Sequence, residues 1–96
     1  MKNDVTAIPD DSVVIVDGLA IHGISPFPEV IQNLHALQWH NNTGTLEIKP
    51  NFDNIHFDSK EEYELYVQPF VDVHSMHKAY NHALRNEEVL LEPFIQ

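Results

Sequence analysis

This chain of 96 residues contains no cysteine, only three glycines, and only five basic residues against fifteen acidic ones. Without cysteine it cannot form a disulfide scaffold, a thiolate zinc site or a thiol nucleophile. So few glycines exclude, in practice, the glycine-rich loops that hold phosphates, and no P-loop, GxGxxG or GxSxG motif occurs. No apolar run approaches the roughly 18 residues needed to span a bilayer. We therefore expect no enzyme, no catalytic residues and no cofactor.

The formal net charge of −10 is the most unusual bulk property of the chain. Such a field opposes unassisted binding to nucleic acid or to an anionic membrane, so we expect neither as a direct partner. Solubility explains the acidity, and the alternative is a surface that imitates nucleic acid or docks on a basic protein. The N-terminus lacks the apolar segment of a signal peptide, so we expect the chain to stay in the cytoplasm.

The length predicts a single domain, residues 1–96. Residues 1–11 are polar and contain a proline, which predicts a flexible arm. Residues 12–49 consist of short apolar runs separated by turn signals, which predicts an antiparallel β-meander of about four strands. The first hairpin is expected to turn at Asp17–Gly18, because both residues tolerate a positive φ.

The segment HALQWHNNTGTLEIK, residues 35–49, contains the only tryptophan. Asparagine and glycine tolerate a left-handed backbone, so we predict a hairpin loop over Asn41–Gly44 with Gly44 in the left-handed conformation. Trp39 is then expected to be a core residue that fixes the register of the hairpin. The alternation of side chains predicts one buried face, made of Leu37, Trp39, Leu46 and Ile48.

The pattern changes at Ser59, where SKEE has the form of a capping box with Glu62 three residues after the N-cap. Residues 59–86 are predicted to be helical, because apolar and aromatic residues recur at spacings of three and four. Pro69 interrupts this stripe, so we expect a kink or a break into two helices at Gln68–Pro69. Residues 87–96 form an apolar tail that either packs back on the sheet or joins a partner. The stripe consists of Tyr63, Tyr66, Phe70, Val73, His77, Tyr80 and Leu84.

Together these elements predict a small α+β fold: an antiparallel meander with one or two C-terminal helices packed on one face. Tyrosine is enriched in protein interfaces, where the ring is buried and the hydroxyl finds a partner. We therefore predict a protein contact at the exposed parts of the stripe and at the tail; the alternative is that the stripe only covers the sheet. The predicted contact residues are Tyr63, Tyr66, Tyr80, Leu90, Leu91, Phe94 and Ile95.

Seven histidines raise the question of a metal site. His74 and His77 are three residues apart on the predicted helix, a spacing that allows both to reach one ion. No HExxH motif occurs, and a third ligand would have to come from another segment. His77 also lies in the aromatic stripe, where a hydrogen-bonded core histidine is the simpler interpretation. We predict no metal site, with His74 and His77 as the candidate ligands if there is one.

Residues 12–50 resemble small bacteriophage and prophage proteins encoded near tail genes. The resemblance rests on the alternating strand before Asp17–Gly18 and on a segment with the pattern His-Ala-hydrophobic-Gln-Trp, a short turn, and Gly-x-hydrophobic-Glu. In this chain the pattern is His35–Trp39, the turn Asn41–Thr43, and Gly44–Glu47.

The resemblance implies a non-enzymatic protein that acts in tail-fibre assembly or as a minor tail component. Its partner would be a phage tail protein or a second copy of the chain, in the cytoplasm of the bacterial host or in the virion. Two alternatives stay open at this point: an acidic inhibitor that occupies the nucleic-acid-binding groove of a host protein, and a histidine-based metal-binding protein.

Overall fold

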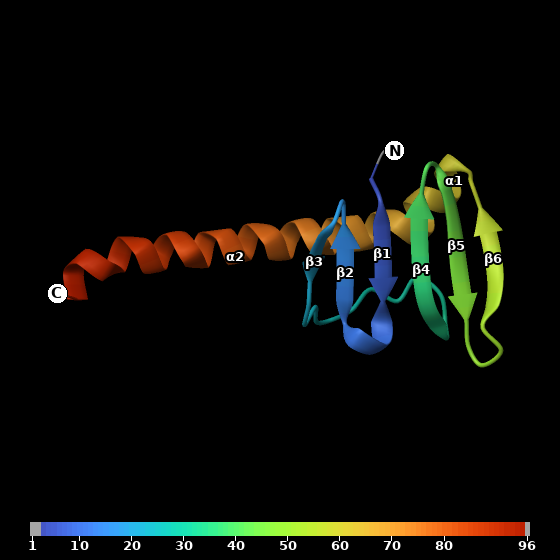
Figure 1. The fold of residues 1–96 in the computed structure, drawn as a ribbon, viewed down its shortest axis with the longest axis horizontal. Coiled ribbons are helices and arrows are strands. Elements are labelled where there is room, and N and C mark those ends of the chain that lie inside the picture. The colour runs from blue at the N-terminus through green and yellow to red at the C-terminus, as the bar shows by residue number, and fades with distance from the viewer. Residues whose placement is uncertain (1–2, 96) are drawn as a thin grey trace.

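The computed structural model describes the backbone of residues 3–95 and the side chains of residues 3–84. It contains one antiparallel sheet, with a long helix across one face (Figure 1). The predicted α+β class is confirmed, but the sheet has six strands where about four were expected. The strands are β1 (Val5–Ile8), β2 (Val13–Val16), β3 (Leu19–Ile21), β4 (Leu34–His40), β5 (Thr43–Ile48) and β6 (Asp53–Phe57), in the spatial order β3-β2-β1-β4-β5-β6.

Val5–Ile8 belong to the sheet, so the flexible arm predicted over residues 1–11 is wrong for the part of it that the structure describes, from residue 3 on. β1 lies between β2 and β4, and Val5 pairs with Val16 on one side and with Trp39 on the other. A short 3-10 helix, η1 (Pro9–Asp11), then leads into β2. Four residues carry too little pattern to predict a strand, and β1 is stabilised by its pairing with β4, which is distant in the sequence.

β4 and β5 form the predicted hairpin, with Leu37 paired to Leu46. The loop is shorter than expected: it consists of Asn41–Asn42, whose φ angles are 55° and 64°, as in a type I′ turn. Gly44 does not have a positive φ, so its predicted left-handed conformation is wrong. It lies in β5, opposite Trp39.

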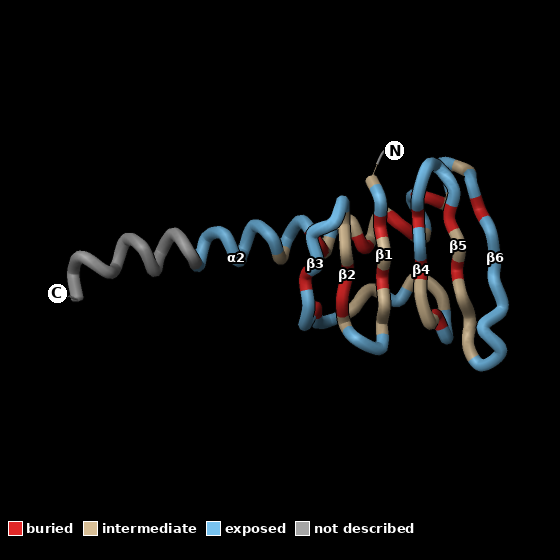
Figure 2. Tube along the Cα trace, in the orientation of Figure 1, coloured by how far each residue is buried: buried red, intermediate tan, exposed pale blue. Residues whose placement is uncertain are grey.

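The core lies between the sheet and the helical layer, and the buried position predicted for Trp39 is confirmed. The Trp39 ring stacks on Phe57 at a centroid distance of 5.6 Å and meets Tyr63 edge-on at 4.9 Å. The segment between β3 and β4 joins this core, because Phe27 packs against Phe70 with ring centroids 5.4 Å apart. Figure 2 shows buried residues along the strands and on the part of the helix that crosses them.

The helical layer begins with α1 (Lys60–Glu62), and the predicted cap at Ser59 is confirmed. The Glu62 backbone N–H donates to Ser59 Oγ at 3.1 Å, and the Ser59 hydroxyl donates to Glu62 Oε1 at 2.8 Å. A π-helical turn, η2 (Tyr63–Val67), follows, and the Gln68 N–H donates to the carbonyl of Tyr63.

The helix continues through Pro69 as α2 (Gln68–Ile95), so the predicted break does not occur. In a regular α-helix a proline ring meets the carbonyl four residues earlier, and here the wider π-helical turn directly precedes the proline. α2 also includes residues 87–95, so these residues do not form a separate tail. Their sequence is rich in glutamate and leucine, which favour helix.

α2 is longer than the sheet is wide. Its 28 residues span about 42 Å at 1.5 Å per residue, whereas six strands at about 4.8 Å spacing span about 24 Å. The helical layer starts with α1 near β5; α2 then crosses β1, β2 and β3 and passes beyond the edge strand β3 (Figure 1). The fold therefore places one edge of the sheet beneath a helix that extends past it.

Candidate protein-docking surface

The point where α2 leaves the sheet is fixed by a buried histidine. His74 is 5% exposed, and its Nε2 donates to the backbone carbonyl of Leu19 at 2.8 Å. The acceptor belongs to β3, so this bond joins the helix to the edge strand. From Ser75 to Leu84 every described residue is exposed except the half-buried His77. His74 therefore marks the boundary between the packed part of α2 and its extension.

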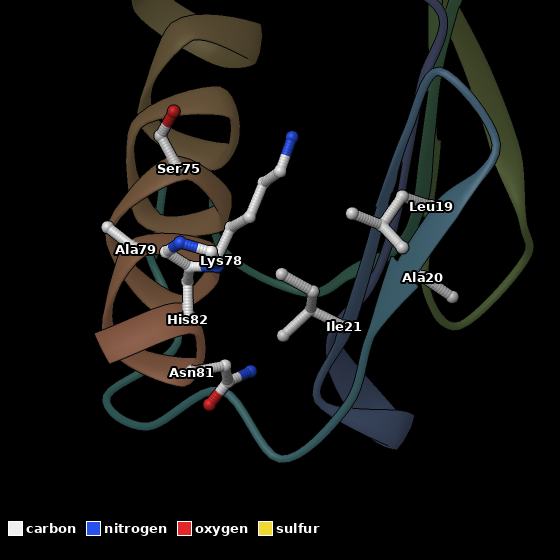
Figure 3. Close-up of a pocket in the computed structure, with 8 residues that line it drawn as sticks. All are labelled: Leu19, Ala20, Ile21, Ser75, Lys78, Ala79, Asn81 and His82. Carbon is white, nitrogen blue, oxygen red and sulfur yellow. The ribbon is translucent and has the colours of Figure 1, made fainter. Parts of the chain in front are cut away.

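An open groove of about 720 Å³ lies between β3 and the start of this extension. In Figure 3 the side chains of Leu19 and Ile21 extend from β3 toward α2, and Lys78 extends into the space between the two elements. We call this feature the β3–α2 groove; its lining residues are Leu19, Ala20, Ile21, Ser75, Lys78, Ala79, Asn81 and His82.

The β3–α2 groove has an unusual charge for this protein. Its lining includes Lys78 and His82 but no carboxylate, although the chain has three times as many acidic as basic residues. Among the residues that the structure describes, Lys78 has no ion-pair partner. The groove thus combines apolar side chains from the strand with an available cation from the helix.

A second exposed surface lies on another side of the same helix. Met76, Tyr80 and Leu84 are 70%, 63% and 40% exposed. Their spacing of four residues places them along one side of α2. We call these three residues the α2 flank.

The predicted contact residues fall into four groups. Tyr63 is 3% exposed and packs on Trp39, so it is part of the core and cannot contribute to a surface contact. Tyr66 is half-buried, with its ring 5.4 Å from that of Phe57. Tyr80 is exposed, as a contact residue requires. The remaining predicted residues lie in α2 but outside the described side chains: Leu90, Leu91, Phe94 and Ile95.

The candidate metal ligands are not brought together with a third group. His74 is engaged with the carbonyl of Leu19, and over residues 3–84 no group of three or more His, Asp or Glu side chains is placed to hold a metal ion. A hydrogen-bonded core histidine was the simpler interpretation of His77 in the sequence. The structure contains such a histidine, but it is His74.

Sequence reasoning did not identify a polar cluster on the sheet. His35 lies between Asp10 Oδ2, 3.8 Å from Nδ1, and Glu47 Oε1, 3.7 Å from Nε2. The ammonium group of Lys49 donates to both carboxylate oxygens of Asp10, at 2.9 and 3.1 Å. These residues come from three segments. The Lys49–Asp10 ion pair is partly exposed and contributes little to stability.

The β3–α2 groove was also missed, because its two walls are more than fifty residues apart in the sequence. The sequence indicated the apolar residues of β3 and the amphipathic helix separately. The placement of α2 over β3 depends on the order of strands in the sheet. A local pattern carries no information on that order.

No protein-family model matches this chain, and neither does a curated protein or a solved structure. Within the described part of the chain, no helix has the combination of length and apolar character that crossing a membrane requires.

Proposed function

We propose that this chain is a non-enzymatic accessory protein that binds another protein through the β3–α2 groove. The class of protein is the one that the hairpin segment resembles, the small phage and prophage proteins of the tail region. The proposed site of action is the cytoplasm of the bacterial host, during tail assembly, with the virion as the alternative. The observation that supports a binding role is the exposed edge strand beneath a helix that extends past it.

An edge strand offers unpaired backbone N–H and C=O groups, which natural proteins usually cover or block. Recognition by strand addition uses these groups for affinity and uses neighbouring pockets to select side chains. β3 has only three residues, so backbone pairing alone would be weak. α2 adds a second wall to the groove, which increases the surface that an added segment can contact.

The chemistry of the groove defines the partner segment. Leu19 and Ile21 favour apolar side chains on the side that faces α2, and Lys78 favours an acidic side chain nearby. The proposed ligand is therefore an extended segment of a partner protein with alternating apolar residues and at least one carboxylate. Charged groups such as these determine the orientation and the choice of the partner more than they raise its affinity.

The test measures binding of the purified full chain to each protein encoded beside it, by isothermal titration calorimetry. Leu19→Lys places a second cation against Lys78 and removes an apolar contact. The matched control is Ile55→Lys on the opposite edge strand, because the two side chains are 46% and 45% exposed. We expect Leu19→Lys to weaken binding at least about tenfold, which corresponds to about 1.4 kcal/mol, and Ile55→Lys to leave it unchanged.

Two results would contradict the proposal. Equal affinities for both variants would show that the groove is not the site, and the absence of any binder among the neighbouring proteins would remove the tail-region assignment. The salt dependence adds a further distinction. Binding that is insensitive to Leu19→Lys but disappears with rising salt would favour the acidic inhibitor instead.

A further inference from the structure

The face of the sheet that is turned away from α2 is covered by no element that the structure describes (Figure 1). On β1 and β2 the residues Ala7 and Val14 belong to the core on the α2 side, so their neighbours along each strand point outward. Val13, which pairs with Ile8, is 4% exposed but lies outside that core cluster. Three of the outward positions hold Ile8, Val13 and Ile15, which we call the outer apolar patch.

The same face has a different character on the other half of the sheet. The row that starts at Ile15 continues through residues that pair in register across β1, β4, β5 and β6: Thr6, Gln38, Thr45 and His56. An uncovered face of an antiparallel sheet usually carries such polar side chains. Strand propensity does not require isoleucine here, because threonine is also branched at Cβ and occupies equivalent positions. The outer apolar patch is therefore a local departure from the rule for an uncovered face.

Aspartates lie at both ends of the outer apolar patch. Asp4 and Asp17 stand opposite each other at one end of the β1–β2 pair, where the Asp4 N–H donates to Asp17 Oδ1 at 2.8 Å. Asp10 and Asp11 lie at the other end, in η1, which connects the two strands. The patch is therefore an apolar surface with an acidic border at each end.

This acidic border stays negative in spite of nearby basic groups. Lys49 Nζ lies 2.9 Å from Asp10 Oδ1, and His35 Nδ1 lies 3.8 Å from Asp10 Oδ2. His40 Nδ1 lies 2.7 Å from Asp4 Oδ1. The other two aspartates have no ion-pair partner within the described part of the chain. With the histidines neutral, four carboxylates and one ammonium group give the border a formal charge of −3.

The acidic border distinguishes between possible occupants of the patch. A second copy does not fit, because both ends are acidic and a two-fold pair would bring aspartates against aspartates in either orientation. The net charge of −10 on each copy adds to this repulsion. A complementary surface instead carries lysine or arginine around its apolar side chains.

We propose that the outer apolar patch and its acidic border bind a second protein, through a surface whose apolar side chains are bordered by lysine or arginine. The β3–α2 groove has the opposite preference, because Lys78 favours an acidic segment. The groove lies on the α2 side of the sheet and the patch on the other side, so both can be occupied at once. This inference does not depend on the function proposed for the groove.

The first test uses three peptides as probes of this chemistry. An amphipathic peptide of leucine and lysine supplies both apolar and basic groups. In the second peptide serine replaces every leucine, and in the third glutamate replaces every lysine. We expect the leucine–lysine peptide to bind the full chain at least about tenfold more tightly than either of the others, as measured by NMR titration. Backbone amide shifts of the isotope-labelled chain should change along β1 and β2 and not in the groove.

The second test uses pairs of matched variants and the leucine–lysine peptide. Ile15→Gln removes an apolar side chain from the patch without a change in charge, and we expect it to weaken binding about tenfold. Thr45→Gln is its control, because Thr45 is also half-buried and points outward on the polar half of the same face. Asp11→Lys should weaken binding about fivefold. Asp53→Lys makes the same change of charge at an exposed site on the far edge strand and should have little effect.

Three results would overturn this assignment. Equal binding of the leucine–lysine and serine–lysine peptides would show that charge alone attracts the peptide. Amide shifts outside β1 and β2 would place the peptide elsewhere. A wild-type dimer that Ile15→Gln converts to a monomer, as measured by light scattering, would assign the patch to a second copy.

The peptide comparison uses the wild-type chain, so it does not depend on the folding of any variant. Circular dichroism of each variant checks that the sheet is retained. Leu19→Lys should leave binding of the leucine–lysine peptide unchanged, because Leu19 faces the groove on the other side of the sheet. A failure of groove binding and a failure of binding at the patch are therefore distinguished by different variants.

Discussion

Gly44 provides the sharpest test of the packing described above. It lies in β5 between Trp39 on β4 and Phe57 on β6 in the sheet register. The rings of these two neighbours stack with centroids 5.6 Å apart, and the Phe57 ring occupies the space in which a Cβ on Gly44 would lie. The glycine is therefore required by the close approach of an aromatic ring, and not by its backbone angles. Gly44→Ala should destabilise the protein.

Two opposing effects determine the magnitude. Replacing glycine by alanine at an unstrained site stabilises a protein by about 0.4–1 kcal/mol, because the unfolded chain loses conformational freedom. An extra methyl group in a packed core costs about 1–3 kcal/mol. Phe57 is 4% exposed and stacked on Trp39, so its ring cannot move without disturbing a second buried ring. The packing term should dominate, and we expect a net loss of about 1–2 kcal/mol.

Urea unfolding monitored by tryptophan fluorescence measures this loss, because Trp39 is the only tryptophan and lies at the site. Gly44→Asn separates the two possible roles of the glycine. Asparagine tolerates a left-handed backbone, so it would be accepted if a positive φ were required; with the ring in place it should destabilise at least as much as alanine. Asn42→Gly is the control in the turn and should change stability by less than about 0.5 kcal/mol. Unchanged stability of Gly44→Ala would refute the packing argument.

Two further predictions concern the cap at Ser59, which the sequence predicted, and strand β1, which it did not. Ser59→Ala removes the hydroxyl that accepts the hydrogen bond of the Glu62 N–H at 3.1 Å. It should lower the free energy of unfolding by about 1 kcal/mol, as measured by urea titration. An unchanged unfolding midpoint would mean that the cap contributes nothing to stability. Deletion of residues 1–8 removes β1, which pairs with β2 and β4. This variant should lose the cooperative unfolding transition in near-ultraviolet circular dichroism, whereas wild-type behaviour would restore the flexible-arm interpretation.

The features that the sequence predicted correctly are local ones. The cap at Ser59, the hairpin that contains Trp39 and the helical stripe each depend on residues that are near one another along the chain. Capping and strand alternation follow from backbone hydrogen bonding and side-chain direction, which are set within a few residues. For the same reason the α+β class could be predicted without knowledge of the sheet order.

The features that were predicted incorrectly depend on contacts between distant segments. The polar residues and the proline of residues 1–11 predict an arm, whereas the pairing of β1 with β4, which is distant in the sequence, makes Val5–Ile8 a strand. Gly44 was assigned to the turn because glycine is common there, whereas the ring of Phe57 is what requires it. Tyr63 was expected at a surface contact, but the edge-on packing against Trp39 places it in the core.

The sequence by itself determined the local elements of this protein, its acidity and its lack of cysteine, because these follow from residue identity and short-range periodicity. The tertiary structure decided which surfaces are available. The order β3-β2-β1-β4-β5-β6 places β3 at an edge, and the crossing of α2 over that edge creates the β3–α2 groove and exposes the α2 flank. Strand order is set by the packing of the whole sheet, so no segment of the sequence contains it.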